Sequence, residues 1–401
     1  MKRLFATFLF ISISLSVILV AAKDKTGIMN QNYNNNKEIV PYAPAFNMDT
    51  LLKWSPESDP DAEYARSRVP LKTGRFYGPQ VNEKATKGVK IQSCSIFKSG
   101  RDAQEQSQFH NYVFTHWQYL DSIAGWGIGD GGNVGILGIP SADQIDAAHR
   151  NGVPITGLFG FPWSTSSYGV SEYKKLVTKN ADGSYPYFDK LAQLCNYYGF
   201  DGYFINQETS GLGSSDAQNL RNAIFYARKK YPNLIFQWYD AMRWDGGGIG
   251  GVNGIGSGNS GWLRYQDDLA KEGVAKPYAM DDIFINYGWN NNVDSSLASM
   301  ESYGRNKYDA IFAFEVQQNG MNTYALSKLS QLVEKNDGKA KASIGYYCID
   351  SNFGIASSPS EFHKIEHKFW STSSGDPRVE PNQTGGIGSN VPGMARFVYD
   401  K

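Results

Sequence analysis

The 401-residue sequence has few cysteines and histidines and no net charge. Its three cysteines, Cys94, Cys195 and Cys348, can form at most one bridge, so packing and not a disulfide framework must stabilise the chain. Lysine plus arginine number 39 and aspartate plus glutamate also number 39. Because binding a run of phosphates needs a basic excess, we expect no nucleic-acid partner. The five histidines offer no convincing metal cluster, and we expect neither a metal nor a cofactor.

Aromatic residues and glycine are abundant instead. Phenylalanine, tryptophan and tyrosine make up 14% of the chain, and glycine occurs 42 times. So many aromatic residues exclude disorder on the scale of the whole chain, and so many glycines allow tight turns and open loops. This composition suits a rigid scaffold with an aromatic ligand surface built from loops.

The N-terminus has the features of a secretory signal at residues 1–22. Lys2 and Arg3 precede an apolar run from Leu4 to Val20, and small residues end it at Ala22. An uncleaved anchor helix is the alternative, because the run is nearly long enough to span a bilayer. No second run of that length follows. We therefore expect a secreted or cell-envelope protein without a membrane span after signal removal.

The rest of the chain divides into three parts. Residues 23–41 are a flexible, Asn-rich lead, and residues 42–109 lead into and pack on the catalytic part, residues 110–401. That last part alternates short runs of β-branched and aromatic residues with segments of helical spacing, such as those beginning at Ser141 and Asp216. Eight runs are expected strands: Tyr112 to His116, Pro154 to Phe161, Gly202 to Gln207, Leu234 to Tyr239, Ile283 to Tyr287, Ala310 to Val316, Ala342 to Ile349 and Ala395 to Tyr399.

This alternation predicts an α/β fold, a (β/α)8 TIM barrel. Further helices are expected from Phe188 and from Tyr324. The eighth run is followed by no closing helix, which leaves an incomplete C-terminal closure as an open alternative.

The segment Phe200 to Thr209, FDGYFINQET, carries the strongest functional signal. Alternate residues of a strand share a face, so Asn206 and Glu208 project together at the carboxyl end of a barrel strand, where this fold places its chemistry. A carboxyl group in an aromatic cleft can serve as a general acid. The Asn206 amide beside this carboxyl group would have a catalytic function if the nucleophile were a 2-acetamido group of the substrate itself. Asn206 could then orient that group. The alternative is a solvated strand end without catalytic function.

The DGxxxNxE motif at Asp201 to Glu208 resembles the endo-β-N-acetylglucosaminidases of glycoside hydrolase family 85. It also differs by one residue from the DGxxxDxE pattern of family 18 chitinases. Six further segments resemble family 85: LLKWSPESDPDAEYARSRVPL from Leu51, HWQYLDS from His116, IPSADQIDAAHRNGVPITGLFGFPW from Ile139, FQWYDAM from Phe236, FINYGW from Phe284 and FAFEVQQNG from Phe312.

The resemblance implies a role for each matching residue. Glu208 would be the general acid and base, Asn206 would steer the acetamido group into an oxazolinium intermediate, and Tyr239 would assist that intermediate. Trp262 and Trp289 match aromatic residues that shape the sugar cleft, and Glu315 falls in a matching segment as a substrate-binding residue. The family needs no metal.

The implied substrate is an N-linked glycan, on a glycoprotein or a free glycopeptide, cut at the β-1,4 bond of its N,N'-diacetylchitobiose core. The residues by themselves add Trp163, which falls past a strand end where a sugar face can stack. Two alternatives stay open: a chitinase-like hydrolase of β-1,4 N-acetylglucosamine polymers, and a glycan-binding barrel without catalysis. We expect a monomer.

One pattern points to another chemistry. Residues His363 to His367 spell HxxEH, an inverted zinc protease motif. Both histidines would share a helix face, but a third ligand would have to come from a short polar tail. A helix surface is the favoured interpretation.

Overall fold

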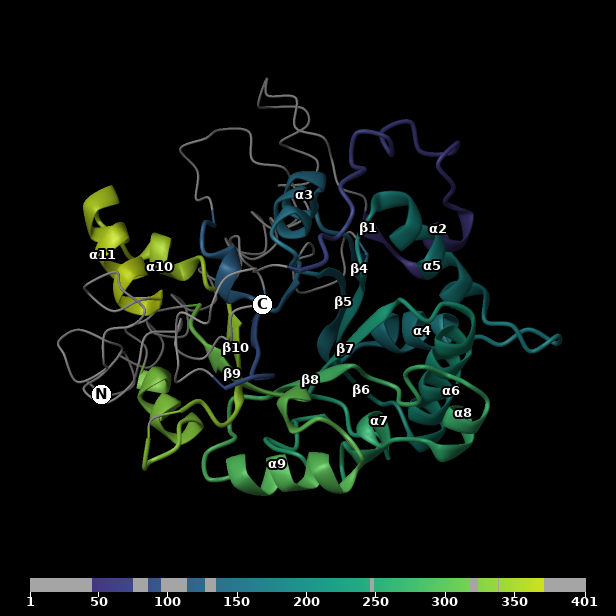
Figure 1. The fold of residues 1–401 in the computed structure, drawn as a ribbon. Helices are drawn as coiled ribbons and strands as arrows, with labels where there is room; N and C mark the ends of the chain where they lie inside the picture. The colour runs from purple at the N-terminus through teal and green to yellow at the C-terminus, as the bar shows by residue number, and fades with distance from the viewer. Residues whose placement is uncertain are drawn as a thin grey trace, which may run out of the picture.

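Eight parallel strands close into a barrel in the computed structural model, which describes residues 45–74, 86–94, 114–126, 135–245, 249–317, 324–337 and 339–370 (Figure 1). Each strand pairs with the next in chain order, and pairing of the last with the first completes the ring. These strands are β2 (Ile91–Cys94), β3 (Ser122–Ala124), β5 (Ile155–Thr165), β6 (Gly202–Ser210), β7 (Ile235–Tyr239), β8 (Asp282–Ile285), β9 (Ala310–Glu315) and β10 (Ser343–Tyr347).

Two short strands extend this sheet. β1 (Ala45–Phe46) pairs antiparallel with β4 (Leu137–Gly138), which in turn pairs antiparallel with β5. Through β4, which lies between β3 and β5 in the chain, β1 connects the segment before the barrel to β5.

Helices lie outside the strands (Figure 1). They are α2 (Met48–Lys53), α3 (Ala142–Arg150), α4 (Ser167–Leu176), α5 (Pro186–Tyr198), α6 (Ser214–Lys230), α7 (Ser260–Leu263), α8 (Asp267–Lys271), α9 (Val293–Ser302), α10 (Ser351–Gly354) and α11 (Pro359–Trp370). Short 3-10 helices cover Trp117–Tyr119, Lys307–Asp309 and Tyr324–Leu332. α5 shows how the sequence sets its ends: Pro186 starts it, and Gly199 ends it in a left-handed conformation with φ of 88°. No helix in the described ranges has the length and apolar character to cross a membrane.

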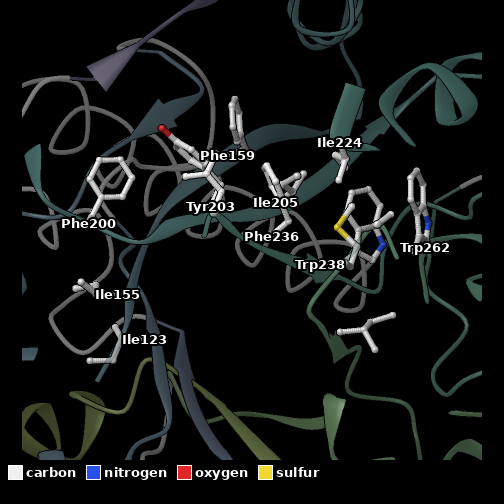
Figure 2. Packing of buried hydrophobic residues seen from close by; sticks show 14 of the residues in the cluster. Ile123, Ile155, Phe159, Phe200, Tyr203, Ile205, Ile224, Phe236, Trp238 and Trp262 are labelled. Atoms are coloured by element: carbon white, nitrogen blue, oxygen red, sulfur yellow. The ribbon is translucent and has the colours of Figure 1, made fainter. Parts of the chain in front are cut away.

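The strands separate two apolar regions. One fills the barrel and contains Leu158, Phe204 and Phe284; the other lies between strands and helices and contains Tyr203 and Ile205 of the same strand β6 (Figure 2). Alternate residues thus face inward and outward. The lumen is tight at Gly345, where a Cβ atom would collide with the ring of Phe284.

The amino end of the barrel is closed by polar side chains. Gln237 donates to Asp282 over 3.0 Å and to Ser122 over 3.3 Å, and it accepts a hydrogen bond from Thr156 over 3.0 Å. Gln92 donates to Ser122 over 3.2 Å. Burial of Asp282 raises the pKa of its carboxyl to about 6 although the Lys90 ammonium acts in the opposite direction. The network lies at the end opposite to the carboxyl ends of the strands, where this fold places its chemistry.

The barrel confirms the expected fold class, but two strands differ from the expectation. β5 to β10 fall where six of the runs predict them. The run Tyr112 to His116 is wrong as a strand, because its described residues, 114–116, have no regular structure; the first two strands are instead β2 and β3. β2 lies in the segment expected only to lead into the barrel. Short strands that contain serine and glutamine, such as β2 and β3, give little sequence signal. Pairing with β10 stabilises β2, and pairing with β5 stabilises β3.

The barrel closes between its last and first described strands. Ala395 to Tyr399 lies outside the described residues, and β10 pairs directly with β2 over four residue pairs, from Ile344 with Ile91 to Tyr347 with Cys94. The alternative of an incomplete C-terminal closure is therefore wrong. The expected helices from Ser141, Phe188 and Asp216 are confirmed as α3, α5 and α6, and the segment from Tyr324 is a 3-10 helix.

Candidate active site

A cavity of about 210 Å³ opens at the carboxyl ends of the strands. It brings together Asn206, Glu208, Tyr239 and Glu315, four of the residues predicted as site residues. Its full lining is Cys94, Trp126, Phe204, Asn206, Glu208, Tyr239, Phe284, Tyr287, Glu315, Gln317 and Tyr347. This is the end of the barrel at which the fold places its chemistry.

Strand β6 supplies the carboxyl and the amide. Asn206 is buried at 3% exposure and Glu208 is half-buried, and the Asn206 Nδ2 donates to Glu208 Oε2 over 2.8 Å. Because a carboxylate oxygen accepts, this contact assigns the nitrogen of the amide to Glu208. The Asn206 Oδ1 is then the atom of that side chain available to accept an N–H from a ligand.

Strand β7 supplies a phenol. The hydroxyl of Tyr239 donates to Asn286 Oδ1 over 3.0 Å. Burial raises the pKa of Tyr239 strongly, and the negative charges of Glu208 and Asp240 raise it further. Tyr239 therefore keeps its proton and can act as a hydrogen-bond donor in the cavity.

The residue after Tyr239, Asp240, binds the glycine-rich loop that follows β7 through hydrogen bonds to its side chain. Its carboxylate accepts from the backbone N–H groups of Val252 and Asn253, over 3.1 and 2.8 Å, and from Asn259 Nδ2 over 3.2 Å. Burial raises the pKa of Asp240 to about 6, against these hydrogen bonds. The described part of the loop is thus fixed to the end of the strand that carries Tyr239.

The opposite wall combines one carboxylate with aromatic rings. Glu315, at the end of β9, accepts the backbone N–H of Gln317 over 2.6 Å, which orients its carboxylate. The rings of Trp126 and Tyr347 meet edge to face at a centroid distance of 5.1 Å. Burial also raises the pKa of Tyr287 well above its usual range. Polar groups set in aromatic walls are typical of a carbohydrate-sized ligand site.

The three predicted tryptophans lie elsewhere. Trp163, at the carboxyl end of β5, is 76% exposed and is absent from the cavity lining. Trp262 and Trp289 are fully buried, so the prediction that they contact the sugar cleft is wrong.

Both buried indoles belong to the region between strands and helices. Trp262 packs on Trp238 at a centroid distance of 4.4 Å (Figure 2), and its N–H donates to the Met242 carbonyl. Trp289 packs on Phe314 and donates to the Ala313 carbonyl over 2.8 Å. A position just past a strand end does not determine which face a side chain covers.

Seven lining residues were not predicted as site residues: Cys94, Trp126, Phe204, Phe284, Tyr287, Gln317 and Tyr347. Cys94 is the last residue of β2, and Trp126 follows β3; neither strand was predicted from the sequence. A usable signal existed for Tyr347, which shares the inward face of β10 with Gly345.

The HxxEH segment lies on α11 with both histidines exposed. Glu366 points the other way: it is buried, accepts from Asn352 and Trp370, and lies 3.2 Å from His116. Nowhere in the described ranges do three histidine, cysteine, aspartate or glutamate side chains form a group that could hold a metal ion.

Comparison with known proteins gives a consistent family assignment. The model of glycosyl hydrolase family 85 matches residues 96–399. The cytosolic endo-beta-N-acetylglucosaminidase of Gallus gallus is 26% identical over 250 residues, 60% of this chain and 30% of that protein. Cytosolic endo-beta-N-acetylglucosaminidase 1 of Arabidopsis thaliana is 27% identical over 248 residues, 59% of this chain and 32% of that protein.

Among solved structures, the glycoside hydrolase domain of Endo-D from Streptococcus pneumoniae R6 aligns with a TM-score of 0.73 and 31% identity, covering 88% of this chain and 55% of that one. The chain thus spans about a third of the length of these curated relatives and about half of that structure.

The comparison also corrects the expected location. The curated relatives are named as cytosolic proteins, and this finding contradicts the expectation of secretion. The apolar run at residues 1–22, on which that expectation depended, lies outside the described residues. The match over residues 96–399 spans most of the sequence, and the chain belongs to glycosyl hydrolase family 85.

Proposed function

We propose that this chain hydrolyses the β-1,4 bond of the N,N'-diacetylchitobiose core of N-linked glycans and retains the configuration at the anomeric carbon. Its substrates are glycans on glycoproteins or free glycopeptides, and it acts as a monomer. The names of the relatives in the same family support this substrate class.

The pair Asn206 and Glu208 is the observation that carries the proposal. A glycosidase with two catalytic carboxylates uses one of them as nucleophile or base. Here the residue hydrogen-bonded to the carboxyl of Glu208 is an amide. The uncharged side chain of Asn206 does not replace the carboxylate nucleophile of such an enzyme, but its carbonyl oxygen can accept the N–H of a substrate acetamido group. The nucleophile then belongs to the substrate.

The proposed reaction has two steps. Glu208 donates a proton to the glycosidic oxygen while the acetamido carbonyl oxygen attacks the anomeric carbon, and the bond to the departing sugar breaks. Glu208, now a carboxylate, takes a proton from a water molecule while the water oxygen bonds to the anomeric carbon. The bond from that carbon to the ring oxygen of the oxazolinium ion breaks, which restores the acetamido group. Two displacements at one carbon retain its configuration.

Other lining residues support these steps. Tyr239 stays protonated and donates a hydrogen bond to the acetamido group in the intermediate. Glu315, oriented by the Gln317 N–H, accepts from sugar hydroxyls. The exposed ring of Trp163 provides a stacking surface beyond the cavity for a sugar outside the cleaved pair.

Parallel incubations with a high-mannose glycoprotein and a chitin oligomer test this function. The proposal predicts release of free glycan from the glycoprotein and little shortening of the oligomer, by chromatography of the labelled products. Cleavage of the oligomer alone would identify a chitinase-like enzyme. Hybrid and complex glycans in the same assay determine which glycan subtype is accepted.

A further inference from the structure

The end of strand β8 contributes a side chain that contacts the proposed catalytic group of β7. Tyr239 pairs with Phe284 in the parallel ladder, and Asn286 follows two residues later, past the end of β8. The Tyr239 hydroxyl lies 3.0 Å from Asn286 Oδ1. Asn286 was not among the expected site residues, and it does not line the cavity.

A second contact fixes the orientation of the Asn286 amide. Its Oδ1 also accepts the backbone N–H of Tyr287 over 2.8 Å. A backbone N–H can only donate, so the atom facing Tyr239 is the oxygen and not the amide nitrogen. It follows that Tyr239 is the donor in the contact with Asn286.

This direction determines what Tyr239 presents to the cavity. A phenol has one hydrogen, and Asn286 holds it in the absence of substrate. The oxygen lone pairs then face elsewhere. To donate to an acetamido group, the hydroxyl turns its hydrogen from Asn286 to the substrate, and until then Asn286 fixes the position of the phenol oxygen.

The geometry points to Asn286 as a positioning residue that holds the Tyr239 hydroxyl ready to bind the acetamido group during bond cleavage. This inference rests on the proposed function. Because Asn286 acts through Tyr239 and touches no reacting atom, its removal lowers kcat more than it raises KM. Loss of one oriented hydrogen bond corresponds to a fall of about tenfold to a hundredfold.

A double-mutant cycle tests the connection between the two residues. We expect Asn286→Ala to lower kcat, and we expect Asn286→Ala combined with Tyr239→Phe to equal Tyr239→Phe alone. Asn290→Ala, which changes an exposed asparagine of the same loop, is the matched control and leaves kcat unchanged. If the losses of the two single variants multiply in the double variant, the inference is wrong.

A second readout does not need turnover. In protein labelled with ¹³C at the ζ carbon of tyrosine, the Tyr239 resonance is the one missing from Tyr239→Phe. The inference predicts that Asn286→Ala moves this resonance and Asn290→Ala does not; an unmoved resonance overturns it. If the wild-type protein cleaves no glycan, the proposed function fails, and the resonance still decides whether Asn286 holds the hydroxyl.

Discussion

The amide nitrogen of Asn206 lies 2.8 Å from Glu208 Oε2, and the two residues occupy the same face of one strand. The contact uses one end of the amide and leaves the carbonyl oxygen for a ligand. It also places the proposed proton donor and the proposed substrate-orienting group within one hydrogen bond of each other. Mutation of each residue therefore has a different expected kinetic result.

Replacement of Glu208 by glutamine removes the group that transfers the proton. We expect kcat to fall ~10²- to 10⁴-fold, the usual contribution of general acid and base catalysis. Binding of a glycopeptide, measured by calorimetry, is retained because the amide has nearly the same shape. Glu334→Gln, at an exposed position, is the control. Unchanged cleavage by Glu208→Gln would support a different catalytic group, and binding without cleavage by the wild type would support the glycan-binding alternative.

Replacement of Asn206 by alanine removes the acceptor for the acetamido N–H. The acetamido group is then no longer oriented toward the anomeric carbon, and we expect kcat to fall about tenfold to a hundredfold, with a smaller change in KM. Steady-state kinetics on a labelled glycopeptide measure both constants. A rise in KM at constant kcat would show that Asn206 contributes only to binding.

The two kinds of tryptophan give opposite expectations. Trp163→Ala removes an exposed ring, so we expect a rise in KM of about three- to tenfold and almost no change in melting temperature. Trp289→Ala empties a fully buried site, and we expect a loss of stability of about 3 to 5 kcal/mol. Thermal unfolding and KM, measured on both variants, check this pair. A stability loss in Trp163→Ala without a change in KM contradicts the stacking role.

The buried carboxyl at the amino end of the barrel makes stability depend on pH. The pKa of Asp282 is raised from 3.8 to about 6 by burial, with negative Asp281 and Asp309 adding to the shift and Lys90 opposing it. The folded protein therefore holds a proton that the unfolded chain releases, and this contribution to stability is lost as the pH rises from about 4 to 6. Above that range the ionised group costs at most about 3 kcal/mol.

Asp282→Asn removes this ionisation. We expect the free energy of unfolding of the variant, minus that of the wild type, to be about 1 to 3 kcal/mol larger at pH 8 than at pH 4. Urea unfolding at both pH values provides the measurement, and Asp268→Asn, on the exposed surface, is the control. A difference between Asp282→Asn and wild type that is the same at both pH values would show that Asp282 does not titrate in this way.

The strand that carries the proposed catalytic pair was readable from the sequence because its signal is local. Alternation along β6 placed Asn206 and Glu208 on one face at the carboxyl end of the strand, and the structure has both on the lumen side with Phe204. Short runs of β-branched and aromatic residues also located the other five strands from β5 to β10. Those features depend on neighbours in the sequence, which a strand pattern reports directly.

The remaining parts depend on contacts between distant segments. β2 and β3 have three or four residues each and form because neighbouring strands pair with them. Cys94 and Trp126 were not predicted as lining residues for that reason. The packing of Trp262 against Trp238 depends on the path of the chain after the loop that follows β7. The alternation of residues along a strand does not predict that path. Asn286 was overlooked because its importance comes from the contact with Tyr239.

The most direct test of the central claim is the mass of a glycoprotein after incubation with this protein. Substrate-assisted cleavage within the chitobiose core predicts a product that keeps one N-acetylglucosamine on each processed asparagine, with the rest of the glycan released. A protein carrying no sugar, two N-acetylglucosamines or the intact glycan would contradict the account.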